Sequence, residues 1–129
     1  MRAPDVPAGR VIAPGVMPSA DRVRAAREIA AVFGPGLRVA LTTHVNSDGD
    51  GVGSEVALWH LLSAAGMRPA IANATPIPER FHFLLPPGAD HSAHAARAIE
   101  DADVIVVLDI SDLARLGHLA GTVRSAGVP

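Results

Sequence analysis

The chain contains no cysteine and no lysine, and these two absences exclude several kinds of chemistry. Without cysteine there is no disulfide and no thiolate-bound zinc, so any metal ion must be held by oxygen and imidazole ligands. All eleven cationic residues are arginine. The chain therefore lacks both the phosphate-binding lysine of a P-loop and the lysine of a Schiff-base enzyme.

Aromatic residues and net charge are also scarce. The 129 residues include three Phe, one Trp and no Tyr, and the formal net charge is −2. Long nucleic acid binds to basic grooves and stacking aromatic rings, so a long duplex is not expected as a partner. The longest aliphatic run, residues 104–108, is far shorter than the ~20 apolar residues of a membrane-spanning helix, and no membrane partner is expected.

The first 18 residues contain several prolines and glycines, and we interpret residues 1–18 as a flexible leader. They lack the apolar block of a secretory signal, and together with the absence of cysteine this favours a cytoplasmic enzyme. Hydrophobic residues make up 49% of the chain and charged residues 19%. This composition is sufficient for one folded domain over residues 19–129.

The order of apolar and turn-forming segments after the leader predicts an α/β fold. Strands are expected at residues 38–45, 70–74 and 103–110. Helices are expected at residues 19–33 and 91–101, and after two further caps, Ser54 and either Ser111 or Asp112. Alternating strands and helices are typical of a parallel sheet with right-handed crossovers and helices on both faces.

Acidic side chains and one histidine follow the ends of two predicted strands. His44, Asp48 and Asp50 lie in or beside a loop rich in Asn and Gly, directly after the first strand. Asp109 ends the apolar run of the third strand, where an unpaired charge would be costly. Ligands of α/β sheets bind at the carboxyl ends of the strands, so we expect these four side chains to meet there.

One imidazole and three carboxylates form an oxygen-rich ligand set that suits Mn²⁺ or Mg²⁺, and the histidine favours manganese. Asp48 and Asp50 are separated by one glycine, so in an extended loop they could face two different ions. Two ions about 3.5 to 4 Å apart can activate a water and stabilise a phosphoryl group during in-line attack. The amino end of a helix capped by Ser54 would add positive potential for a phosphate.

Two segments resemble the motifs of a known family. The run THVNSDGDGVGS, residues 43–54, is similar to the first motif of the DHH phosphoesterase superfamily, His-x-x-x-Asp-x-Asp-x-x-Gly-Ser. The run VLDISDLARLG, residues 107–117, resembles the second motif, and the resemblance extends over roughly residues 37–129. The stretch FHFLLP, residues 81–86, is similar to one in the subgroup of bifunctional oligoribonucleases and 3′-phosphoadenosine-5′-phosphate phosphatases.

The resemblance implies manganese-dependent hydrolysis of phosphate esters, in short oligoribonucleotides or 3′,5′-nucleoside bisphosphates. It also implies that His44 and Asp48 hold one Mn²⁺, that Asp50 holds the other, and that Asp109 bridges both. The superfamily's Asp-His-His motif and its substrate-binding carboxyl-terminal domain do not occur in the 129 residues. We therefore expect residues 19–129 to be the incomplete, amino-terminal half of a DHH domain, inactive by itself. Ser47 replaces the proline of many members and leaves the ligands unchanged.

Other interpretations of the same residues stay open. Residues 46–51 also resemble the start of an EF-hand calcium loop, although Ala57 stands where a bidentate Glu is needed. Asn, Asp and Gly could simply form a turn, and Asp109 could cap the helix that follows it. The functional alternative to a hydrolase is a non-catalytic metal- or nucleotide-binding regulatory module of the same fold.

Overall fold

The structure is a computed structural model that describes residues 18–129, so the predicted leader lies outside the described residues except for its last position. The described residues divide into two units, the first ending at Ala31 and the second beginning at Val32. In the first unit, helix α1 (Ala20–Ala30) begins after Ser19, whose Oγ accepts a hydrogen bond from the Arg22 N–H at 3.3 Å. The predicted cap is confirmed, although the helix ends before the predicted end at Phe33.

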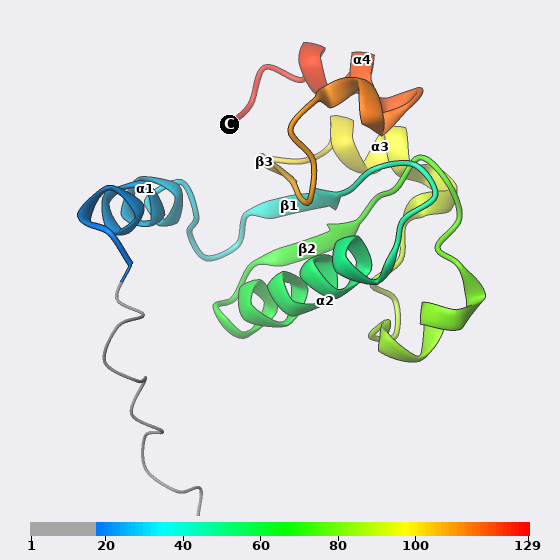
Figure 1. The fold of residues 1–129 in the computed structure, drawn as a ribbon, viewed down its shortest axis with the longest axis horizontal. Coiled ribbons are helices and arrows are strands. Elements are labelled where there is room, and N and C mark those ends of the chain that lie inside the picture. Colours follow the sequence, from blue (N-terminus) through cyan, green and yellow to red (C-terminus); the bar gives the residue numbers. More distant parts are fainter. Residues whose placement is uncertain (1–17) are drawn as a thin grey trace, which may run out of the picture. The chain divides into compact units, whose positions relative to one another are not determined.

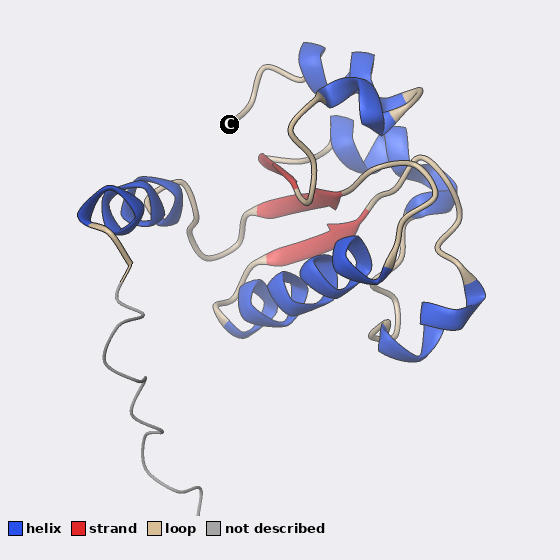
Figure 2. Cartoon of the chain, in the orientation of Figure 1, coloured by secondary structure: helices blue, strands red, loops and turns tan. Residues whose placement is uncertain are grey.

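The second unit is built on a three-stranded parallel sheet (Figures 1 and 2). Its strands are β1 (Arg38–Thr42), β2 (Arg68–Ile71) and β3 (Val104–Val107), in the order β2-β1-β3. In the register of the sheet, Leu41 of the central strand pairs with Ile71 on one side and Val106 on the other. The predicted parallel sheet is confirmed, with strand boundaries that differ by a few residues from those expected.

Helices cover both faces of this sheet (Figure 1). The longest is α2 (Gly49–Ala64), whose Val52, Val56 and Leu62 pack with the side chains of Val39 and Leu41 on one face. The opposite face is covered by α3 (Ala95–Glu100) and α4 (Leu119–Ser125), which pack around Ala40 of the same strand. Successive side chains of a strand point to opposite faces, so β1 contributes to both hydrophobic clusters and is buried.

Three short 3-10 helices complete the second unit: η1 (Glu79–Leu84), η2 (Ser92–His94) and η3 (Leu113–Leu116). Two of them replace parts of predicted helices. The helix expected at residues 91–101 is divided into η2 and α3. The last predicted helix is interrupted at Gly117, where a φ of +60° breaks the helical path between η3 and α4.

Within residues 18–129, no helix combines the length and the hydrophobicity needed to cross a membrane.

Candidate metal centre

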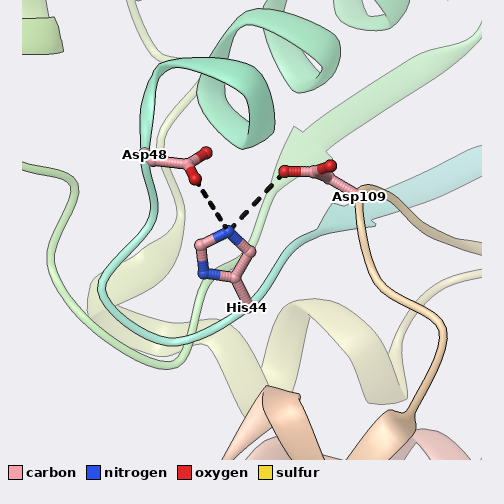
Figure 3. Close-up of side chains that lie close together, drawn as sticks. All are labelled: His44, Asp48 and Asp109. Atoms are coloured by element: carbon pink, nitrogen blue, oxygen red, sulfur yellow. Dashed lines mark ion pairs between the residues drawn. The ribbon is translucent and has the colours of Figure 1, made fainter.

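Three predicted site residues lie together beyond the carboxyl ends of β1 and β3 (Figure 3). His44 Nε2 is 3.6 Å from Asp48 Oδ2 and 3.7 Å from Asp109 Oδ2. The imidazole points between the two carboxylates, which come from opposite sides of it (Figure 3). One potential ligand atom from each residue lies within 4.8 Å of the other two, so the three side chains surround a common point.

The orientation of His44 leaves its Nε2 atom facing the two carboxylates, where it could bind a metal ion. The ring is buried, with 7% of the residue exposed, and Nδ1 lies 2.9 Å from the Val45 carbonyl oxygen. A carbonyl can only accept, so Nδ1 carries a proton and donates it, and in the neutral imidazole the lone pair is then on Nε2. Proteins usually fix a metal-binding histidine through a hydrogen bond of this kind, made by the ring nitrogen that does not bind the metal.

Asp48 is at once the N-cap of α2 and a member of this cluster. Its Oδ1 accepts a hydrogen bond from the Gly51 N–H at 3.0 Å, while Oδ2 faces His44. The Gly51 N–H stabilises the charged form and lowers the pKa of the Asp48 carboxyl. The prediction that Ser54 caps this helix was wrong, because the Asp48 side chain satisfies the helix amides earlier in the chain.

Asp109 follows β3 in an unusual backbone conformation, with a φ of +58° in the left-handed region. This conformation turns its side chain toward His44 (Figure 3). The alternative role as a helix cap is excluded, because Asp112 is the residue that caps η3, through a 2.9 Å hydrogen bond from the Ala114 N–H to Asp112 Oδ1.

Asp50 and Ser54 are not part of the three-residue cluster. Asp50 lies exposed in the first turn of α2, and Ser54 is exposed one turn further along. The assignment of Asp50 to a second ion and of Ser54 to a phosphate stays a prediction. The early start of α2 also shows that the EF-hand interpretation was wrong, because residues 49–57 are helical instead of forming the calcium loop.

The arrangement of the cluster fits a divalent ion. Ligand atoms about 2.1 Å from one ion lie about 3 Å apart at right angles and about 4 Å apart on opposite sides. The two measured separations from His44 Nε2, 3.6 and 3.7 Å, fall in this range. Carboxylates and imidazole are both common ligands of divalent metal ions in proteins. His44, Asp48 and Asp109 could therefore hold one such ion.

Direct contacts between the two loops hold them beside each other. The Val45 N–H donates a 2.9 Å hydrogen bond to the Arg115 carbonyl. Gly117 lies so close to Val45 that a Cβ atom at Gly117 would be 2.7 Å from Val45 Cγ1. The loop carrying His44 is thus fixed to the segment that follows Asp109.

Three residues that the sequence analysis did not single out connect the strand ends: Thr43, Glu55 and Asn73. All three are buried, with 0% exposure. Glu55 is the only acidic residue between positions 51 and 62, where the other residues of α2 are mostly apolar. This isolated acidic residue was the sequence signal from which a buried role for Glu55 could have been predicted. Asn73 carried no comparable signal, because its partners lie far away in the sequence.

Comparison with known proteins supports the fold. No family model matches the sequence. The structure is similar to that of an exopolyphosphatase-related protein from Bacteroides fragilis, with a TM-score of 0.71 and 21% sequence identity. The match covers 79% of this chain and 32% of the other, so the chain spans about a third of that protein's length. At this identity the likeness shows a shared fold.

Proposed function

We propose that this chain provides the first metal-binding half of a phosphoesterase, and that the metal is manganese. The observation that carries the proposal is the position of His44 Nε2 between two carboxylate oxygens, while its other nitrogen is occupied by the Val45 carbonyl. The exopolyphosphatase-related protein of the same fold supports a phosphate-containing substrate. The order of the two acidic motifs supports the DHH type of site.

The protein groups around the cluster are suited to a phosphate ester. A bound divalent ion would supply a Lewis acid for the phosphoryl group and a water of lowered pKa. The first turn of α2 begins at the cluster, and the amino end of a helix carries a positive potential that favours anions. The carboxylates of Asp48 and Asp109 would orient the ion beside this helix end.

The 3-10 helix η1, which contacts the start of α2 through Phe81, supports a nucleotide as the substrate. Phe81 lies beside the start of α2, where its Cε1 atom is 3.6 Å from the position of a Cβ on Gly49. The Arg80 guanidinium lies over the Phe81 ring, 4.7 Å from its centroid. Phe83 in the same 3-10 helix is 82% exposed. An arginine and an exposed aromatic ring could bind a phosphate and stack on a base, as a short oligoribonucleotide or a 3′,5′-nucleoside bisphosphate requires.

The proposed second ion would need ligands in addition to Asp50. The chain spans about a third of the exopolyphosphatase-related protein, and the remainder of a complete domain would supply these ligands. We therefore expect the 129-residue chain to bind one Mn²⁺ and to hydrolyse phosphate esters slowly or not at all. A chain that hydrolyses a nucleoside bisphosphate at the rate of a complete phosphoesterase would contradict this part of the proposal.

Isothermal titration with Mn²⁺ tests the metal centre directly. His44→Ala and Asp109→Asn should each weaken Mn²⁺ binding by about tenfold or more, since even residues that merely support a ligand have effects of this size. Asp101→Asn is the matched control, because this carboxylate pairs with Arg97 at 2.7 Å, away from the cluster. Equal affinities for the wild type and the two site variants would refute the proposal.

A further inference from the structure

One buried carboxyl group in α2 does not belong to the candidate metal centre. Glu55, in α2, is 0% exposed, and its Oε2 accepts a hydrogen bond from Asn73 Nδ2 at 3.0 Å. Its Oε1 has no hydrogen-bond partner among the residues that the structure describes. Burying a carboxyl group in this way is unfavourable, so its retention in the core calls for a role.

The contact with Glu55 determines which way the Asn73 amide faces. Asn73 Oδ1 accepts hydrogen bonds from the Thr43 N–H at 3.0 Å and from the Thr42 hydroxyl at 3.4 Å. If the amide were rotated by half a turn, its NH₂ group would face the Thr43 N–H, donor against donor. An acceptor at Glu55 Oε2 favours the observed orientation, because it satisfies the NH₂ group on the opposite side.

Thr43 extends this chain of hydrogen bonds to the third strand. Its hydroxyl donates to the Leu108 carbonyl at 2.9 Å, and the Leu108 N–H donates to the Thr42 carbonyl at the same distance. Thr43 immediately precedes His44, and Leu108 immediately precedes Asp109. The path from Glu55 therefore reaches the residues adjoining two of the three clustered side chains, through the ends of β2, β1 and β3.

We propose that Glu55 and Asn73 form a positioning pair that sets the separation of His44 and Asp109 through Thr43 and Leu108. Neither residue belongs to the cluster that would hold the ion, so the pair would act by fixing the strand ends. This inference rests on the proposed metal centre. The hydrogen bonds from Glu55 Oε2 through Asn73 to Thr43 favour one arrangement of the strand ends, and the orientation of a ligand affects metal affinity.

The distinguishing comparison uses two substitutions at Glu55. Glu55→Gln keeps an oxygen that can accept from Asn73, whereas Glu55→Met has a similar volume and no comparable acceptor. We expect Glu55→Met to weaken Mn²⁺ binding by about tenfold or more, and Glu55→Gln to remain within about threefold of the wild type. Equal losses in both variants, or no loss in either, would overturn the positioning role.

Amide hydrogen exchange at Thr43 gives a readout that does not depend on the metal. In the metal-free protein, Glu55→Met should lower the protection of the Thr43 N–H more than that of Leu41 in the same strand. Glu55→Gln should preserve it. Unchanged protection of Thr43 in Glu55→Met would also overturn the proposal. If Glu55→Met does not fold, Asn73→Ala removes the same link from the side of β2.

Leu62→Ala separates positioning from a general loss of stability. Leu62 is buried near the other end of α2, so this variant should lower stability and leave Mn²⁺ affinity unchanged. A Leu62→Ala variant that loses as much Mn²⁺ affinity as Glu55→Met would overturn the positioning role. Failure of the wild-type chain to bind Mn²⁺ would reject the metal centre itself, whereas wild-type binding that Glu55→Met leaves unchanged would reject the positioning pair alone.

Discussion

Gly51 and Thr43 lie so close together that a Cβ atom on Gly51 would be 2.8 Å from Thr43 Oγ1 and 3.0 Å from Thr43 Cγ2. The contact seats the first turn of α2 against the end of β1. Thr43 is completely buried and its hydroxyl is bonded to Leu108, so it has little freedom to move away. A side chain at position 51 would therefore push the Asp48 cap away from His44.

Replacement of two nearby glycines should have opposite effects on stability. Gly51→Ala should destabilise the protein by about 1–3 kcal/mol, because overpacking of a buried contact outweighs the better helix propensity of alanine. Gly53→Ala is the matched control, since a Cβ there meets nothing within 4 Å, and it should stabilise the protein by about 0.5–1 kcal/mol. Urea denaturation measures both, and equal stabilisation of the two variants would contradict the packing described above.

Binding of Mn²⁺ should stabilise the folded chain. An ion that binds only the folded state adds about 2.7 kcal/mol to the free energy of unfolding at a concentration one hundred times its dissociation constant. The midpoint of thermal unfolding should therefore rise with added Mn²⁺ and return to its starting value with a chelator. His44→Ala should remove most of this rise, and a rise of equal size in that variant would place the ion elsewhere.

The buried Glu55 carboxyl predicts a stability that falls as the pH rises. Burial is the main cause that raises its pKa from 4.5 to about 8, and the negative charge of Asp90 adds to the effect. Between these two pH values the folded chain retains a proton that the unfolded chain has lost, so raising the pH favours unfolding. Below pH 4.5 the effect is absent, and above pH 8 it is complete.

Glu55→Gln should remove this dependence on pH. The stability of the variant relative to the wild type should increase by about 1.4 kcal/mol per pH unit at most, between about pH 5 and pH 8. Urea denaturation at several pH values measures the difference. A constant difference over this interval would show that Glu55 is already ionised in the folded protein.

The pairing of Arg38 with Asp103 predicts a loss of stability at low pH. Arg38 contacts the carboxylate through its backbone N–H at 2.8 Å, Nε at 3.2 Å and Nη2 at 3.0 Å, joining the starts of β1 and β3. The Arg38 side chain is the main cause that lowers the pKa of Asp103 from 3.8 to about 2. The stabilisation is therefore fully present above pH 4 and is lost as the pH falls toward 2.

Asp103→Asn provides the test of this pairing. It should lower the midpoint of thermal unfolding by a few degrees at pH 7 and have a much smaller effect near pH 2, where about half of the wild-type carboxylate is protonated. Asp101→Asn, in a neighbouring exposed ion pair within α3 and its C-cap, serves as the comparison. If Asp103→Asn lowers the midpoint of thermal unfolding equally at both pH values, the contribution of the pair is not ionic.

The convergence of His44, Asp48 and Asp109 could be predicted because it depends on one rule of architecture. Parallel strands end at the same edge of a sheet, so polar residues directly after two neighbouring strands are brought together. The structure places these three residues as that rule implies. Their role as metal ligands stays a prediction that the titrations above can test.

The start of α2 could not be predicted from local preferences. Residues 49–53 contain three glycines, which disfavour a helix and suggested a loop ending at Ser54. The Asp48 cap and the contact of Gly51 with Thr43 stabilise the helix there instead. The network of Glu55, Asn73 and Thr43 was also beyond prediction, because its hydrogen bonds join residues 18 and 30 positions apart.

Asp109 occupies a backbone conformation that glycine adopts more easily than any residue with a side chain. A substitution of Asp109 by Gly would relieve this backbone strain and at the same time remove a carboxylate from the cluster. If Asp109 holds the proposed ion, folding stability alone would favour glycine at position 109, whereas metal binding requires the aspartate. Stability and metal binding would then make opposite demands on this one position.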